Sequence, residues 1–184
     1  MKWMATIVSV LVFALPAAAS AREWKVDPAH STLAFTGTYQ DEKFEGRFER
    51  FDAKVGYDPA DPAHAKFDVT VDIASVDTAN TERDQALPGK DFFDIARFPR
   101  AHFVTTRFRQ VANGAVLADG TLSLRGVAKP VTLSVKFARV GSGAILDVDT
   151  TLKRLDFGVG GGDWADTSMI GNDVAVHGHL VLLP

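Results

Sequence analysis

Two histidines near the C-terminus, His177 and His179, have the spacing of a metal-binding pair. Residues two apart on a strand point to the same face, so both imidazoles could reach one ion. They alternate with Val176, Gly178 and Leu180, however, so we expect them to face solvent while those apolar residues face inward. The sequence offers no evident third ligand and contains no cysteine. We therefore predict no metal site, no thiol chemistry and no cofactor.

A second group with the residue types of a catalytic site is Asp27, His30 and Ser31. A nucleophilic triad needs these three groups aligned in space beside an oxyanion site, and no nucleophile-elbow motif accompanies them. Hydrogen bonding in a turn at the start of a strand explains the same residues. We predict no catalytic residues, and a protein that is not an enzyme.

Cations close to aromatic residues are the remaining candidates for chemistry. A phosphate or a quinone carbonyl would use one or two of them as hydrogen-bond donors, whereas each could equally be a solvated or salt-bridged surface group. The candidates are Arg83, Lys90, Arg97, Arg100 and Arg154.

All of these cations except Arg154 lie in or next to residues 75–99, a connection between two strand-like runs that is too long for a hairpin. Residues 80–87 predict a short helix, which Pro88 and Gly89 should end. The aromatic residues that follow, including Phe92, Phe93 and Phe98, carry too much apolar surface to remain in water. The segment is either a plug that closes one end of a β core or a gate over a ligand cavity.

The rest of the chain from Trp24 alternates apolar and polar residues in short runs separated by turn signals, which predicts an antiparallel sandwich or barrel. Small residues at the inward positions Ala118, Gly120 and Gly178 either leave room for a ligand or accommodate strand bends. Residues 158–162 are glycine-rich and predict a mobile surface loop, and Trp164 after it packs at the barrel mouth or forms a second flap. About eight strands are expected, at residues 31–39, 43–57 with a bend near Phe51, 65–73, 102–110, 116–124, 131–140 after a turn over 125–130, 144–154 and 173–183.

The N-terminus has the pattern of an export signal: a lysine, an apolar run over residues 5–15 and small residues before a cleavage point after Ala21. We expect residues 1–21 to be a signal peptide and residues 22–184 to form one domain in the periplasm. The 184 residues carry a formal net charge of −3, and nothing indicates a nucleic-acid partner.

Seven short motifs in order, each weak alone, make the chain resemble the YceI-like family. They are residues 27–31 (DPAHS), 46–48 (GRF), 75–78 (SVDT), 91–94 (DFFD), Phe98-Pro99 with Phe103, 120–131 (GTLSLRGVAKPV) and 154–159 (RLDFGV).

The resemblance implies an all-β fold: an antiparallel, eight-stranded, lipocalin-like barrel with a short helix and a long aromatic loop at one end. It implies a periplasmic carrier that holds a polyisoprenoid, an isoprenoid quinone or a similar lipid in an elongated interior tunnel. Residues 163–174 resemble the branch associated with cytochrome b561-type membrane proteins, so an accessory role to such a redox partner stays open, as do a homodimer and an enzyme acting on a lipid. Many members have a histidine shortly after the Arg-Asp pair, whereas residues 85–87 here are Gln-Ala-Leu.

On this interpretation we expect the ligand to contact aromatic and aliphatic residues of the inward faces and of the long connection, with two arginines near its polar end. The predicted binding residues are Phe35, Phe48, Phe92, Phe93, Phe98, Phe103, Leu122, Leu133, Phe157, Trp164, Arg83 and Arg154.

Overall fold

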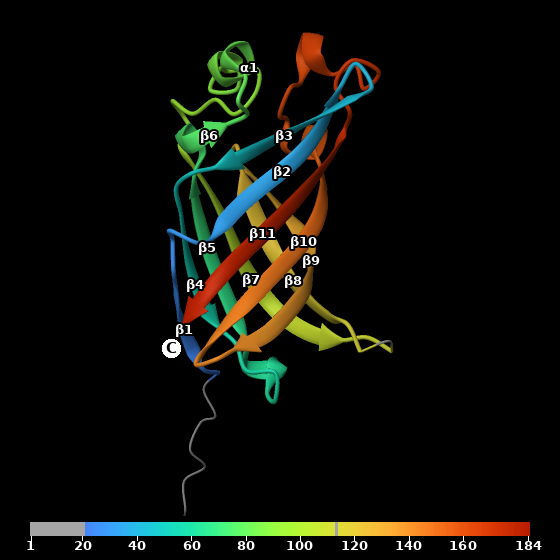
Figure 1. Cartoon of the computed structure of the whole chain (residues 1–184). Coiled ribbons are helices and arrows are strands. Elements are labelled where there is room, and N and C mark those ends of the chain that lie inside the picture. The colour runs from blue at the N-terminus through green and yellow to red at the C-terminus, as the bar shows by residue number, and fades with distance from the viewer. Residues whose placement is uncertain (1–20, 113) are drawn as a thin grey trace, which may run out of the picture.

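The structure, a computed structural model, describes residues 21–112 and 114–184. The predicted signal peptide lies, apart from Ala21, outside these described residues. They form a barrel with two lobes at one end, here called the upper end, and β1 and the C-terminus lie near the other, lower end (Figure 1). No helix of the described part is long and apolar enough to cross a membrane.

The strands form one antiparallel sheet that closes on itself. Their bounds are β1 (Glu23–Val26), β2 (Thr32–Tyr39), β3 (Glu42–Phe48), β4 (Phe51–Gly56), β5 (Lys66–Asp72), β6 (Val76–Asp77), β7 (Arg100–Gln110), β8 (Val116–Leu124), β9 (Val127–Val140), β10 (Gly143–Lys153) and β11 (Asp173–Leu183). The ring runs β1-β4-β5-β7-β8-β9-β10-β11 and closes where Val26 of β1 lies opposite Leu182 of β11. The predicted eight-stranded antiparallel barrel is confirmed.

The strands β2, β3 and β6 extend this barrel upward beside β11 (Figure 1). β1 and β2 both pair with β11, so together they act as one strand with a break. β3 and β4 also act as one strand with a break, because β3 pairs with β2 and β4 pairs with β1. The break between β3 and β4 is at Glu49 and Arg50, slightly before the predicted bend. Likewise the one-turn helix η2 (Ile73–Ser75) separates β5 from the short β6. The segments β1 and β6 were not predicted as strands.

The connection between β8 and β9 is shorter than the sequence suggested. Only Arg125 and Gly126, with φ values of 51° and 75°, form the turn, and Pro130 lies within β9 opposite Thr121. β9 pairs with β10 only from Ser134 onward. At Pro130 the edge of β9 that faces β10 is therefore unpaired, and the missing N–H of proline costs no ladder hydrogen bond there. Toward the upper end, β9 and β10 thus continue beyond their common ladder.

The lower half of the barrel is filled by side chains. Five aromatic rings, here called the aromatic plug, pack with centroid separations of 4.9 to 6.1 Å, and the indole of Trp24 donates a hydrogen bond of 2.8 Å to the carbonyl of Tyr57. Burying rings of this size contributes most of the stability of such a core. The plug consists of Trp24, Tyr57, Phe67, Phe108 and Phe137.

Inward glycines make room for large rings on neighbouring strands. A Cβ atom on Gly120 would lie 2.5 Å from the ring of Phe103, and one on Gly37 would lie 2.7 Å from the ring of Phe44. On Gly178 a Cβ atom would lie 2.8 Å from Val148. The space at the predicted small positions Gly120 and Gly178 is therefore occupied by neighbouring side chains of the wall.

Candidate functional site

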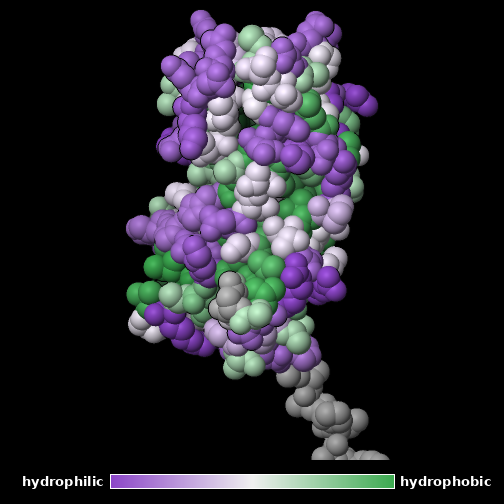
Figure 2. Space-filling model, turned by 90° about the vertical axis from the view of Figure 1, so that its right-hand side faces the viewer, coloured by the Kyte–Doolittle hydropathy of each residue, from purple (hydrophilic) through white to green (hydrophobic). Residues whose placement is uncertain are grey.

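A cavity of about 520 Å³ occupies the upper half of the barrel. Its wall is mainly apolar, and its charged members, Glu82, Arg83 and Arg154, all belong to the two lobes. The outer surface of the same end is different, because many hydrophilic residues lie at the upper end on the face seen in Figure 2. The predicted residues that line the cavity are Phe35, Phe48, Phe92, Phe93, Phe103, Leu122, Leu133, Phe157, Trp164, Arg83 and Arg154.

Phe98 is a correction to the predicted site, because it does not line the cavity. Its ring lies against the turn between β8 and β9, where a Cβ atom on Gly126 would approach it to 2.6 Å. The guanidinium of Arg97 covers the ring at 4.9 Å from its centroid. Phe98 therefore packs the long connection against the turn between β8 and β9. Lys90 and Arg100, also considered as cations of the site, do not belong to the cavity wall described here either.

The cavity has a closed floor above the aromatic plug. Val69, Leu133 and Val148 each line the cavity on one side and pack against the lower core on the other. Phe103, lying over Gly120, adds a ring to the wall at this level. The elongated tunnel implied by the family resemblance is thus a pocket whose lower end is blocked.

The first lobe, residues 78–99, contains the helix α1 (Thr81–Ala86). The side chain of Asn80 caps this helix by accepting a hydrogen bond from the backbone N–H of Arg83, and the helix ends before Pro88 as predicted. A helix of six residues is unstable alone, so its position depends on tertiary anchors. One anchor is Asp84, which accepts hydrogen bonds from the backbone and the hydroxyl of the buried Thr78.

Apolar contacts hold the rest of the first lobe to the barrel wall. Phe93 and Ile95 pack on a cluster formed by Val71, Ile73 and Ala101. The ring of Phe93 also contacts Phe48 of β3 at 6.1 Å. The aromatic connection therefore packs at the upper end and lines the cavity, while a role as a gate stays a prediction.

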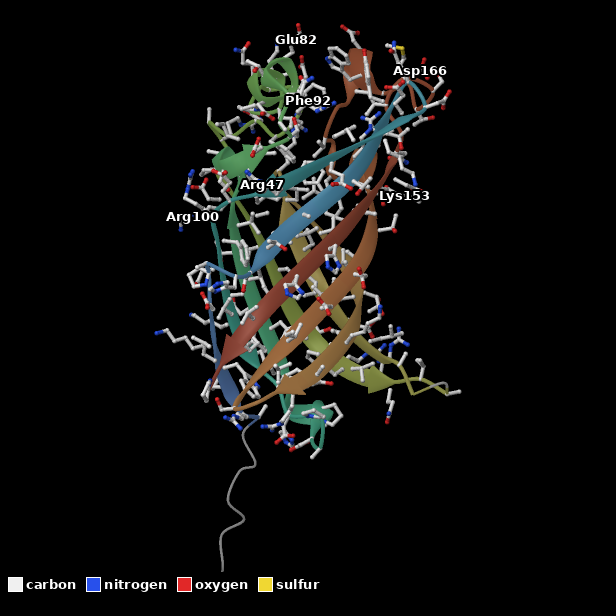
Figure 3. All side chains as sticks on the ribbon, viewed as in Figure 1. Arg47, Glu82, Phe92, Arg100, Lys153 and Asp166 are labelled. Atoms are coloured by element: carbon white, nitrogen blue, oxygen red, sulfur yellow. The ribbon has the colours of Figure 1, made fainter. Side chains whose placement is uncertain are left out.

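The second lobe, residues 154–172, lies opposite the first and includes the one-turn helices η3 (Arg154–Phe157) and η4 (Gly162–Trp164). Phe92 lies between the lobes in Figure 3, and its ring contacts that of Trp164 at 5.6 Å. The N–H of Gly160 donates a hydrogen bond of 2.8 Å to the carbonyl of Asp91. The tip of the β2–β3 hairpin supports the second lobe through a bridge between Tyr39 and Ile170. The two lobes and the hairpin therefore form one connected cap.

Arg154 holds the second lobe together. Its guanidinium is buried, with 7% of the residue exposed, and all five of its N–H donors reach backbone carbonyls. Burial lowers the pKa of Arg154, but the ordinary value lies so far above neutrality that the group stays charged. The accepting carbonyls belong to Val159, Gly160, Trp164, Ile170 and Gly171.

These bonds correct the prediction of a mobile surface loop at residues 158–162. Val159 and Gly160 are buried, and their carbonyls are fixed by the guanidinium of Arg154. Glycine is required at position 160, because φ is +65° and a Cβ atom there would lie 2.5 Å from Arg154 Nη1. The glycines therefore serve close packing around an arginine.

Arg83 is placed differently from Arg154. Its Nε donates a hydrogen bond of 2.9 Å to the hydroxyl of Thr78, and its guanidinium lies 4.1 Å from the ring centroid of Phe44. Within the described part of the chain, the structure assigns no protein acceptor to its terminal Nη1 and Nη2 groups. Because Arg83 also lines the cavity, these donors are available to a polar group at the upper end.

Some wall residues were missed as binding residues. Leu33, Tyr39 and Phe44 were recognisable from the alternation along β2 and β3, whereas Ile170 lies in a loop where no periodic pattern predicts its direction.

The remaining candidates for chemistry lie outside the cavity. His177 and His179 point outward, as predicted, and contact Asp149 and Asp147 of β10 at 2.7 and 2.6 Å. Among residues 21–112 and 114–184, no group of three or more His, Cys, Asp and Glu residues could hold a metal ion.

The three residues Asp27, His30 and Ser31 make separate hydrogen bonds. Asp27 contacts His30 at 2.8 Å, and Ser31 Oγ accepts a hydrogen bond from the N–H of Val181. The prediction of turn and strand-start hydrogen bonding is therefore confirmed.

Comparison with known proteins identifies the family. The model of the YceI-like domain matches residues 24–182. The chain belongs to the YceI-like family. A UPF0312 protein of Shewanella denitrificans is 39% identical over 132 residues, which is 70% of this chain and 68% of that protein. A UPF0312 protein of Vibrio cholerae is 31% identical over 157 residues, covering 80% and 83% of the two chains.

Solved structures show the same fold. The crystal structure of Burkholderia cenocepacia BcnA superposes with a TM-score of 0.82 at 33% identity, over 85% of this chain and 99% of that one. A domain from Saccharophagus degradans, described as polyisoprenoid-binding, superposes with a TM-score of 0.64 over 88% and 97% of the two chains. Its 17% identity makes that likeness one of fold.

We predict that Arg154→Gln loosens the second lobe of this YceI-like protein. Several buried carbonyls would lose their donors, so the free energy of unfolding should fall by about 3 kcal/mol. Hydrogen exchange measured by mass spectrometry should show at least tenfold faster exchange of the amides of Val159 and Gly160. The control Lys153→Gln removes only an exposed ion pair with Asp173 and should change neither quantity. Unchanged exchange in Arg154→Gln would show that the lobe is held by other contacts.

Proposed function

We propose that this protein binds and carries a lipid with a long apolar tail, such as a polyisoprenoid or an isoprenoid quinone, in the cavity of its barrel. One observation supports this most strongly: the cavity has an apolar wall and a closed apolar floor, while its charged side chains are confined to the lobes at the upper end. A molecule that matches this distribution has an oily tail and one polar end. The volume of about 520 Å³ lies within the range of roughly 300–1,000 Å³ that ligand pockets usually have.

The energetics favour the tail as the main source of affinity. Each CH₂ group removed from water contributes about 0.8 kcal/mol, so a tail that fills the cavity gains several kcal/mol. The cost of ordering the ligand reduces that gain. The walls are already held in place by the barrel and the cap, so the protein has little ordering cost of its own.

The polar end of the ligand is assigned to Arg83 rather than Arg154. All five donors of Arg154 are used by the carbonyls of the second lobe, whereas Arg83 lines the cavity and its terminal nitrogens have no assigned protein acceptor among the described residues. An arginine with two free terminal nitrogens can hold a phosphate or a carbonyl oxygen. Arg83 would therefore orient the ligand with its head at the upper end.

Relatives support the class of ligand. The structural neighbour from Saccharophagus degradans is described as a polyisoprenoid-binding domain, and this chain has the same fold. The export signal predicted in residues 1–21 supports a periplasmic location for the carrier. A cytochrome b561-type partner and a homodimer stay predictions.

The cavity favours binding over catalysis. An enzyme acting on a lipid would need ionisable groups held together inside the cavity. The charged groups of the described wall are two arginines and Glu82, and Glu82 is exposed on the first lobe, where Figure 3 shows it at the top. Neither arginine is suited to act as a general base, because a guanidinium group carries donors and no acceptor.

We predict that native mass spectrometry of protein purified from its own cells shows bound lipid. The apolar side chains that line an empty cavity lack van der Waals contacts, which a lipid tail would supply. Mild organic extraction should remove that mass, and added prenyl lipids should restore it. Protein that is empty when isolated and takes up none of the added prenyl lipids would contradict the carrier proposal.

We also predict that Arg83→Gln weakens binding of a prenyl monophosphate at least tenfold, since it removes a charged donor from the head group. The matched control is Arg97→Gln, because Arg97 is a cation of the same lobe whose side chain is 74% exposed and lies outside the cavity wall. Binding can be followed by isothermal titration calorimetry. Equal losses in both variants would indicate general electrostatic attraction instead of contact with Arg83.

A further inference from the structure

The mouth of the cavity can be located from wall residues that are also exposed to solvent. Such residues mark the place where the cavity meets the outside of the protein, whereas the rest of the described wall is buried or half-buried. Three of them lie on α1 or at its N-cap, one at the tip of the β2–β3 hairpin and one in η4. The mouth therefore lies at the upper end, between these three elements, where Figure 3 shows Glu82 of α1. The exposed wall residues are Tyr39, Asn80, Glu82, Ala86 and Trp164.

Of the elements around this mouth, α1 is the least firmly packed. None of its six residues is buried, and a helix of this length is unstable without tertiary contacts. By contrast, the N–H of Gln40 in the hairpin tip donates a hydrogen bond of 2.8 Å to the carbonyl of Met169 in the second lobe. The second lobe is itself held by the buried guanidinium of Arg154. Elements with few buried contacts open first, so α1 is the part of the rim that can move.

The backbone at both ends of α1 suits a hinge. Ala79, just before the N-cap, has a φ of 54°, which residues with a Cβ atom rarely adopt. Such a conformation persists only because surrounding contacts impose it, so the chain there loses strain when α1 swings away. At the other end, the N–H of Phe93 donates a hydrogen bond of 3.0 Å to the carbonyl of Leu87, and Phe93 packs on the barrel wall. The segment free to move is therefore residues 80–86, between Ala79 and Leu87.

Thr78 is the point that holds α1 closed. This residue follows β6 directly and is 6% exposed, so it belongs to the firm part of the structure. Its hydroxyl donates a hydrogen bond of 2.7 Å to Asp84 Oδ1 and accepts one of 2.9 Å from Arg83 Nε. Within the described residues, every side-chain hydrogen bond that joins α1 to the rest of the barrel ends at Thr78. Polar contacts of this kind can be exchanged for contacts with water at a small net cost.

We propose that α1 is a lid, which swings about Ala79 and Leu87 to let the lipid enter and leave, and that the hydroxyl of Thr78 is the latch that closes it. This inference rests on the proposed function and adds the route of the ligand to it. Arg83, which meets the polar end of the ligand, belongs to the lid, so the head group and the lid move together. The aromatic connection beyond Leu87 stays in place as part of the wall.

The first test loosens the latch. Thr78→Val keeps the shape of the side chain and removes the hydroxyl, so α1 should open more often. Protein loaded with a prenyl monophosphate of three units is mixed with an excess of the deuterated ligand, and native mass spectrometry follows the replacement with time. We expect replacement about tenfold faster than in wild type. Hydrogen exchange should also be faster at the amides of Asp84 and Leu87, which are bonded within α1.

Thr105→Val is the matched control. The hydroxyl of Thr105 also makes two hydrogen bonds, with the N–H and the carbonyl of Phe67, but Thr105 lies in the barrel wall and does not line the cavity. Its loss should leave the replacement rate unchanged. Equal acceleration in both variants, or a wild-type rate in folded Thr78→Val, would overturn the lid.

The second test obstructs the mouth and does not depend on the folding of Thr78→Val. The chain contains no cysteine, so a single introduced cysteine can be labelled selectively with fluorescein maleimide. Ala86→Cys places the label at the mouth, whereas Ala96→Cys places it on an exposed residue of the same lobe outside the cavity wall. Ala128→Cys places it on an exposed residue of β9, in the stretch that has no partner on the side of β10. We expect replacement about tenfold slower with the first label and the wild-type rate with the other two.

The outcomes separate the lid from the proposed function. Equal rates with the labels on Ala86→Cys and Ala96→Cys, or slow replacement with the label on Ala128→Cys instead, would overturn the lid and leave the carrier intact. Wild-type protein that takes up none of the ligand would overturn the proposed function. Hydrogen exchange in ligand-free Thr78→Val would then still decide whether α1 is the element that opens.

Discussion

The structure depends on a difference between the two halves of the barrel: side chains fill the lower half and leave a cavity in the upper half. Inward apolar residues line its whole length, but the rings of the aromatic plug fill only the lower half, while β9 and β10 diverge above Ser134. The upper half therefore encloses a cavity with an apolar wall, and its upper opening must be covered if water is to be excluded. The two lobes and the hairpin tip provide that cover, and their contacts to one another, such as Phe92 with Trp164, follow from the need to close one opening.

The polar residues of the cap have divided roles. Arg154 uses all five of its N–H donors on backbone carbonyls of the second lobe, so its charge serves the architecture. Arg83 is held by Thr78 and by the face of Phe44, and it lines the cavity. Arg154 stabilises the cap, and Arg83 can bind the polar end of a ligand in the cavity.

Much of this could be predicted from the sequence, because alternation reports directly which residues of a strand face inward. It placed Phe35, Leu122 and Leu133 in the wall, and the long aromatic connection indicated a closed end. The difference between Arg83 and Arg154 could not be predicted, since the carbonyls around Arg154 come from residues up to 17 positions away. Phe98 and the glycine-rich loop were misjudged for the same reason: turns and loops are placed by tertiary contacts, and local patterns do not encode those.

The most direct test of the carrier account is a crystal structure of the protein with a prenyl monophosphate of three units. The account predicts a tail enclosed between the floor residues and the cap, with a phosphate oxygen about 2.8 Å from a terminal nitrogen of Arg83. A ligand bound on the outer surface, with the cavity unchanged, would contradict it.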